Sequence, residues 1–272
     1  MRTDHHDTSG APVTPARRRS HLRAVALPAE HGGWSLTLEP VVLGLLVAWS
    51  WSGLAIGVAA LFAFLARTPL KFVLVDRWRG RWLPRTSVAA RVAAVELTFL
   101  LVLAVLAVRA SVHPFWWPLV AAAPLLATEL WFDMRSRGRR LLPELAGTIG
   151  MGAVATAIAL ADGAEVALAV GLWVVVAARG GAAIPYARTQ VFRAHGRDPS
   201  LVLSDLAQAG AAVAALAAWI GGLVPLAAAL AIVGVAAFNL VAVRRAPRPA
   251  KIVGLQQMTF GIAVILVTAL AV

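Results

Sequence analysis

The pattern that indicates the fold is clearest in residues 51–91, which read WSGLAIGVAALFAFLARTPLKFVLVDRWRGRWLPRTSVAAR. A mostly apolar run, which holds Arg67 and Lys71 near its end, leads into a segment rich in arginine. About 20 apolar residues cross the hydrocarbon core of a bilayer as an α-helix. Because this alternation recurs along the chain, the sequence predicts an all-α, polytopic transmembrane helical bundle.

The basic residues also predict an orientation. All of the 25 Lys and Arg residues except Arg109 fall in five clusters, at Arg2–Arg23, Arg67–Arg91, Arg135–Arg140, Arg179–Arg197 and Arg244–Lys251. Short cytoplasmic loops of membrane proteins retain Lys and Arg, whereas translocated loops lose them. We therefore expect every cluster, and the N-terminus, to lie on the cytoplasmic side.

Composition excludes several other classes of protein. Of the 272 residues 60% are hydrophobic and 14% are charged, which leaves too little polar surface for a soluble globule. The net charge of +12 does not indicate nucleic-acid binding, because the basic residues recur from loop to loop, and aromatic residues such as Trp116, Trp117 and Trp173 lie near the predicted edges of the bilayer. The absence of cysteine excludes disulfides, a thiolate nucleophile and cysteine-ligated metals.

The chain divides into a tail and one membrane domain. Residues 1–27 are polar and basic and are expected to form a disordered cytoplasmic tail, whereas residues 28–272 form a single transmembrane domain. Nine crossings place the C-terminus outside. The expected helices are Trp34–Trp51, Gly53–Val75, Arg91–Val108, Pro114–Phe132, Pro143–Ala161, Glu165–Ala187, Leu203–Trp219, Leu223–Val243 and Ile252–Val272.

A weak internal echo relates the second and sixth of these helices. Arg67 is followed after nine residues by Asp76 and after 14 by Arg81, and Arg179 is followed at the same offsets by Arg188 and Arg193. The two helices run in the same direction, as a parallel duplication of a four-helix unit would leave them. Chance recurrence of arginine explains the echo equally well.

Cationic residues at membrane depth are the main site candidates. Arg67 and Lys71 are one turn apart on the second helix, and Arg179, Tyr186 and Arg188 follow one another on the sixth. Together they could form a cationic recess for an anionic head group, since arginine matches phosphate oxygens with forked donors. The alternative is that these side chains snorkel separately to the interface.

The start of the first helix holds a second group of candidates. His31, Gly32 and Trp34 open it, and Glu39 follows inside. A histidine with carboxylates could bind a metal or relay protons, although a structural helix start is the better interpretation. Glu39 is expected to neutralise a buried arginine, because an unpaired charge at this depth is costly.

The remaining acidic residues offer a weak metal-site hypothesis. Glu129 and Asp133 stand four residues apart, which places both carboxylates on one helix face. They could hold Mg²⁺, or they could face Arg135 and Arg137. For Glu144 the expected partner is Arg140, four residues before it.

Four motifs resemble those of the YwiC-like family of bacterial membrane proteins. The first, PAEHGGW at residues 28–34, resembles the family signature P-x-x-H-G-x-W. The others are RTPL at 67–70, LLPELAG at 141–147 and YAR at 186–188. The resemblance implies a multi-pass protein of the bacterial cytoplasmic membrane, and it implies no defined activity.

A weaker, architectural resemblance is to the UbiA superfamily of intramembrane prenyltransferases. That resemblance implies binding of a prenyl diphosphate through Mg²⁺ at aspartate-rich ends of the second and sixth helices. This chain departs from it, because Asp76 stands alone on the second helix and arginines occupy the sixth. Direct binding of a phosphate by arginine is therefore favoured over Mg²⁺ as a cofactor.

Two functional hypotheses follow. One is a protein that binds or transfers a prenyl diphosphate or another anionic membrane lipid at a cationic cavity open to the cytoplasm. The other is a transporter, or a lipid-binding or structural membrane protein without covalent chemistry. A transporter would favour broken helices, and Gly180, Gly181 and Pro185 predict one in the sixth helix. The sequence does not specify catalysis, substrate or oligomeric state.

The first prediction concerns orientation. Reporter domains fused after Arg137 and after Arg245 should report the cytoplasmic side, and fusions after Asp162 and after the C-terminus should report the opposite side. Paired alkaline phosphatase and fluorescent protein fusions measure this directly. An external signal from either basic connector would contradict the predicted topology.

Overall fold

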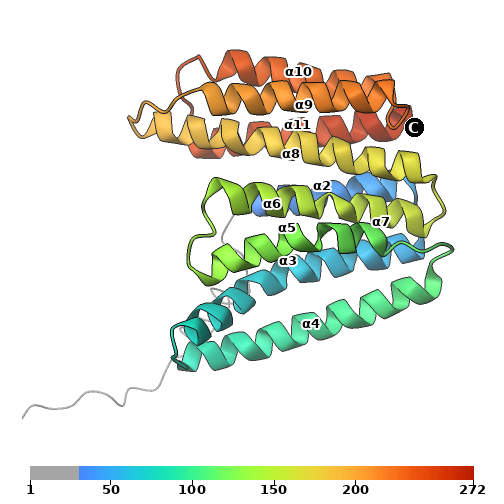
Figure 1. The fold of residues 1–272 in the computed structure, drawn as a ribbon, viewed down its shortest axis with the longest axis vertical. Helices are drawn as coiled ribbons and strands as arrows, with labels where there is room; N and C mark the ends of the chain where they lie inside the picture. The colour runs from blue at the N-terminus through green and yellow to red at the C-terminus, as the bar shows by residue number, and fades with distance from the viewer. Residues whose placement is uncertain (1–30) are drawn as a thin grey trace, which may run out of the picture.

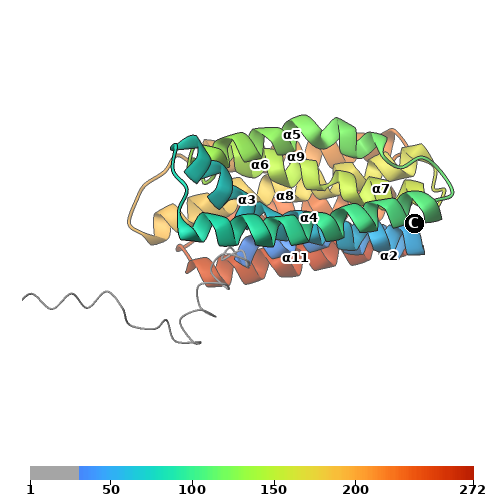
Figure 2. The same cartoon turned by 90° about the horizontal axis from the view of Figure 1, so that it is seen from below.

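The computed structural model describes residues 31–272, so the expected tail at residues 1–27 lies outside the described part of the chain. The described residues form an all-α bundle in which the helices run nearly along one common axis (Figure 1, Figure 2). The elements are α2 His31–Val47, α3 Trp51–Trp78, α4 Pro84–Ala110, α5 Trp117–Met134, α6 Leu141–Met151, α7 Ala153–Ala161, α8 Val166–Ala194, α9 Val202–Ile220, α10 Leu226–Ala242 and α11 Ala250–Ala271.

The nine predicted helices are confirmed within residues 31–272, where α6 and α7 follow one another as a single helical run interrupted at Gly152. In this described part of the chain six helices, with α6 and α7 counted as one, are long and apolar enough to span a membrane, and the chain is a multi-pass membrane protein. At the interruption the indole Nε1 of Trp173 donates to the carbonyl of Ile149 over 2.7 Å. A Cβ at Gly152 would collide with the Trp173 ring, so glycine permits this close approach.

The basic connectors all gather at one end of the bundle. The α3–α4, α5–α6, α8–α9 and α10–α11 connectors lie together on the left in Figure 1, and the C-terminus lies at the opposite end. The connectors at that opposite end, residues 48–50, 111–116, 162–165 and 221–225, contain no Lys or Arg. The clusters of basic residues in the sequence therefore correspond to one end of the bundle, and the connectors without Lys or Arg correspond to the other end.

Helix α7 forms the centre of the bundle, and every one of its residues is buried. It contacts α2, α3, α5 and α8, and small alanine side chains let these neighbours approach closely. Helix α4 lies at one edge, packs chiefly against α3, and exposes large apolar side chains such as Leu101 and Val105. Those exposed side chains are suited to contact with lipid.

Helices α4 and α8 are longer than predicted, since α4 begins at Pro84 and not at Arg91, and α8 ends at Ala194 and not at Ala187. Helix α8 continues unbroken through Gly180, Gly181 and Pro185 to Ala194, so the expected interruption there is wrong. Gly180 instead lies against Thr148 of α6, where a Cβ would collide with the threonine methyl group. Its small size serves helix packing and not a break in the backbone.

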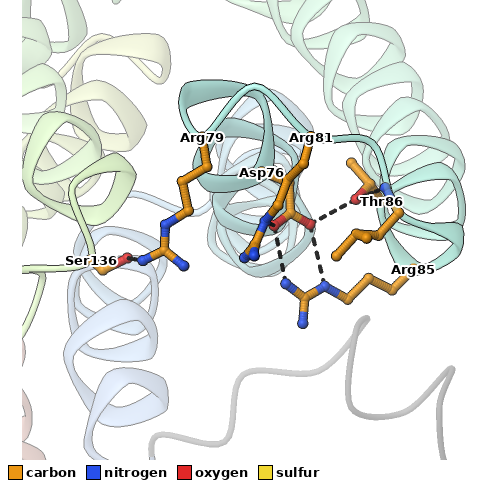
Figure 3. A network of polar contacts seen from close by, with 7 residues as sticks. Asp76, Arg79, Arg81, Arg85, Thr86 and Ser136 are labelled. Atoms are coloured by element: carbon orange, nitrogen blue, oxygen red, sulfur yellow. Dashed lines mark hydrogen bonds and ion pairs between the residues drawn. The ribbon is translucent and has the colours of Figure 1, made fainter.

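The turn between α3 and α4 is held by a buried carboxylate. Asp76 accepts hydrogen bonds from Arg81 and Arg85, both at 3.0 Å, and from Thr86 at 2.7 Å (Figure 3). Arg79 donates to Ser136 over 3.2 Å and so connects this turn to the α5–α6 loop. The hydrogen bonds of Asp76 therefore go to residues of the α3–α4 turn and the start of α4.

Candidate functional site

An ion pair at membrane depth joins three helices. Nη1 of Arg179 on α8 lies 2.9 Å from Oε2 of Glu39 on α2, and the two side chains are only 3% and 6% exposed. Ser35 donates to the other Glu39 oxygen over 2.7 Å, and Nη2 of Arg179 donates to the carbonyl of Gln257 on α11. The expectation that Glu39 neutralises a buried arginine is confirmed.

Close packing by α11 encloses this ion pair. A Cβ at Gly261 would collide with both the Glu39 carboxylate and the Arg179 guanidinium. Only glycine lets the α11 backbone lie this near, so water has little access and the attraction between the charges is weakly screened.

A second cluster of charges joins α3 to α5. Arg67 lies 2.7 Å from Glu129 and 2.7 Å from Asp133, and Lys71 lies 3.1 Å from the other oxygen of Asp133. These partners correct the expectation that the carboxylates face Arg135 and Arg137. The guanidinium of Arg135 instead lies over the rings of Trp78 and Trp131.

The same cluster bears on the metal hypothesis for Glu129 and Asp133. Both carboxylates are engaged by cations of α3, and in the described part of the chain no third acidic or histidine side chain joins them in a metal-binding group. A divalent ion would have to compete with Arg67 and Lys71 for these oxygens.

An apolar cavity of about 250 Å³, hereafter the Arg67 cavity, lies beside this cluster. Helices α2 to α6 all contribute to its walls, and Arg67, Glu129, Thr37 and Thr148 supply its polar groups. A Cβ at Gly147 would collide with the Glu129 carboxylate, so α6 passes directly against it. The cavity can accept an apolar chain next to one polar end.

A separate cavity of about 210 Å³, hereafter the Arg179 cavity, lies between α2, α6, α8 and α11. Its polar lining is Ser35, Glu144, Arg179, Arg188 and Gln257. Nη1 of Arg188 lies 2.8 Å from Glu144, so the expectation that Glu144 pairs with Arg140 is wrong. Tertiary packing brings α8 closer to this carboxylate than the sequence neighbour.

The predicted cationic residues are divided between the two cavities. Arg67 lines the first, with Lys71 one turn away, whereas Arg179 and Arg188 line the second, and Leu36 of α2 lines both. Tyr186 lines neither, because it is fully buried and its hydroxyl accepts from Gln190 and Gln256, each at 3.3 Å. The structure therefore does not gather the five residues around one recess.

The predicted motif at the first helix is placed in part. The residues from His31 onward belong to α2, and the side chains of His31 and Gly32 lie outside the described residues. The ring of Trp34 packs edge-on against Phe64 of α3, with 5.2 Å between the ring centroids. Trp34 thus joins α2 to α3 at the rim of the Arg67 cavity.

Sequence reasoning missed a chain of buried amides. Gln257 donates to Asn239, Asn239 to Gln208, and Gln208 to the carbonyl of Ala182, over distances of 3.1, 3.2 and 2.8 Å. This chain connects α11, α10, α9 and α8 in turn. The sequence did contain a signal for this chain, because Gln208, Asn239 and Gln257 each stand inside an apolar run. Amide side chains within a membrane need hydrogen-bond partners, as charged side chains do.

Comparisons with known proteins assign a family to part of the chain. The family described as YwiC-like protein matches residues 27–159, slightly less than half of the sequence. The match includes three of the four motifs that resemble this family and leaves out the one at residues 186–188. No curated protein and no solved structure matches the chain.

The second prediction concerns the buried ion pair. Arg179→Ala or Glu39→Ala should each destabilise the protein by about 3 kcal/mol or more, because each leaves one charge buried without a partner. The double replacement Glu39→Leu with Arg179→Met should recover much of this loss, since apolar side chains can substitute for a buried pair. Thermal unfolding in detergent measures all three variants. Single variants as stable as the wild type would show that the pair contributes nothing.

Proposed function

We propose that the protein binds an anionic amphiphile, either an isoprenoid phosphate or another anionic membrane lipid, at the end of the bundle that faces the cytoplasm. The apolar chain occupies the Arg67 cavity, and the head group lies against Lys71 and the basic α5–α6 loop. The observation that carries the proposal is an apolar cavity in the membrane domain near a hollow that is lined by Lys71 and the basic α5–α6 loop.

The shape of the Arg67 cavity favours entry from the lipid. Leu97 of α4 and Leu130 of α5 both line it, and they are 40% and 37% exposed. The cavity therefore extends between these helices toward the hydrocarbon, which is where the chain of an amphiphile resides. Because α4 packs chiefly against α3, it leaves this side accessible.

The basic loop supplies the surplus of positive charge that a phosphate needs. The charges of Arg67, Lys71, Glu129 and Asp133 cancel within their own cluster. A hollow beside that cluster is lined by Lys71 together with the loop residues Ser136, Arg137, Gly138, Arg139 and Arg140. Arginines there can bind phosphate oxygens with paired hydrogen bonds and without a divalent ion.

The proposal concerns binding. Prenyl transfer as in the UbiA superfamily would need, in addition, a second substrate and a group that stabilises a developing cation. A transporter would need a path to the other end of the bundle, and the residues that line the two cavities do not include any of α7. Binding is therefore the function that the geometry supports best.

The third prediction tests the chain cavity. Leu97→Trp should narrow the opening between α4 and α5 and lower the affinity for farnesyl diphosphate or phosphatidylglycerol by roughly tenfold, which corresponds to 1.4 kcal/mol. Leu101→Trp places the same side chain on an exposed part of α4 that does not line the cavity, and it should have no effect. Native mass spectrometry in mild detergent with a chelator present measures the bound fraction.

The head group is tested with the same assay. Arg137→Gln and Arg140→Gln should each weaken binding, by about the 1.5–3 kcal/mol of a hydrogen bond to a charged group, and Arg245→Gln on another basic connector should not. Competition by inorganic diphosphate separates a free phosphate ligand from a lipid. Equal binding by Leu97→Trp and Leu101→Trp, or none by the wild type, would refute the proposal.

A further inference from the structure

We propose that the Arg179 cavity is a second ligand site, for a small zwitterion of amino-acid size. The carboxylate of this ligand pairs with Arg188 and its ammonium group pairs with Glu144. The inference goes beyond the binding of an amphiphile, because this cavity lies on the other side of Leu36 and has different lining groups.

The two ion pairs of this cavity differ in how firmly they are held. Glu39 and Arg179 form the inner pair, which is 3% to 6% exposed and is fixed by Ser35 and by the carbonyl of Gln257. Arg188 and Glu144 form the outer pair, which is 30% and 32% exposed, and Arg188 also donates to the carbonyl of Arg139 over 3.0 Å. The inner wall is therefore rigid, whereas the outer pair can exchange its partners for those of a ligand.

Charge balance favours a zwitterion over a simple anion. Each arginine of the cavity is offset by one carboxylate, so the lining carries no surplus of positive charge. An added anion would have to displace Glu144 from Arg188 and leave that carboxylate without a partner. A zwitterion supplies a partner to each of the two groups that it separates.

Two polar atoms lie behind the inner wall of the cavity. Nε of Arg179 and Oε1 of Gln257 are buried, and neither has a hydrogen-bond partner among the described residues. Both belong to side chains that line the cavity, and they represent one donor and one acceptor.

The size of the cavity limits the ligand. A volume of about 210 Å³ is below the roughly 300–1,000 Å³ of the pockets that take drug-sized ligands, which favours a small ligand. Leu36, Ala183, Ile184 and Met258 form the apolar part of the lining and can accept a short side chain.

The chain offers matched variants for the test. Gly254 lines the cavity on α11 and a Cβ there would meet nothing, so Gly254→Leu fills the cavity and leaves both ion pairs in place. Gly234 on α10 is equally open and does not line the cavity, so Gly234→Leu is its control. Arg188→Gln removes the outer pair, and Arg244→Gln removes the comparable exposed pair of Arg244 with Asp205.

The experiment is equilibrium binding of tritiated glycine, L-alanine, L-serine and L-glutamine to the protein in lipid nanodiscs. We expect saturable binding of at least one of them, which neither lactate nor ethanolamine displaces at equal concentration because each lacks one charged group. Gly254→Leu and Arg188→Gln should weaken this binding at least tenfold, and Gly234→Leu and Arg244→Gln should not change it.

Three outcomes would overturn the inference. They are no saturable binding of any of the four amino acids by the wild type, equal binding by Gly254→Leu and Gly234→Leu, and displacement by lactate alone, which would indicate a simple anion site. If Arg188→Gln does not fold, Gly254→Leu alone tests whether the amino acid binds in the Arg179 cavity. Farnesyl diphosphate binding should persist in Gly254→Leu, so failure here is distinguishable from failure of the proposed amphiphile site.

Discussion

The interaction on which the structure depends is the ion pair between Glu39 and Arg179. At membrane depth each of these charges alone would be costly, so the first helix, the long α8 and the last helix α11 must meet at one place. This requirement joins the part of the chain that matches the YwiC-like family, residues 27–159, to the part beyond it. Gly261 of α11 is part of the same arrangement. A side chain at this position would collide with Glu39 and Arg179 and push α11 away from α2 and α8.

The same physical rule organises the other polar groups. Asp133 is fully buried and is held by two cations of α3, and the amides of α9, α10 and α11 bind one another in series. Polar groups that cannot reach water must find partners on neighbouring helices, and these partnerships specify which helices are adjacent. Where the partnerships leave space between helices, the two cavities remain. Both lie beside ion pairs, so each combines an apolar wall with a charged end.

Several elements of the fold could be predicted because they depend on local composition. The alternation of apolar runs and basic loops predicts the crossings, and the gathering of those loops at one end follows from the number of residues between them. The candidate site was predicted only in its components. Arg67, Lys71, Arg179 and Arg188 were recognised as cations at membrane depth, and pairing of Glu39 with an arginine was expected. The cations were assigned to one recess, whereas Arg67 lines one cavity and Arg179 and Arg188 line another.

The sequence by itself determined the class of the protein, the approximate positions of its helices and the segregation of charge between its ends. These properties follow from hydrophobicity and charge along short segments, because the hydrophobicity of each segment decides whether that segment enters the bilayer. Only the tertiary structure decided which polar side chains form ion pairs and hydrogen bonds with one another. Glu144 binds Arg188 and not the nearby Arg140, Asp133 binds Arg67 and Lys71, and Tyr186 faces amides and not Arg179. Those choices depend on how helices far apart in the sequence rotate and pack, because side chains in a bundle are paired across helices by packing and not by distance along the chain.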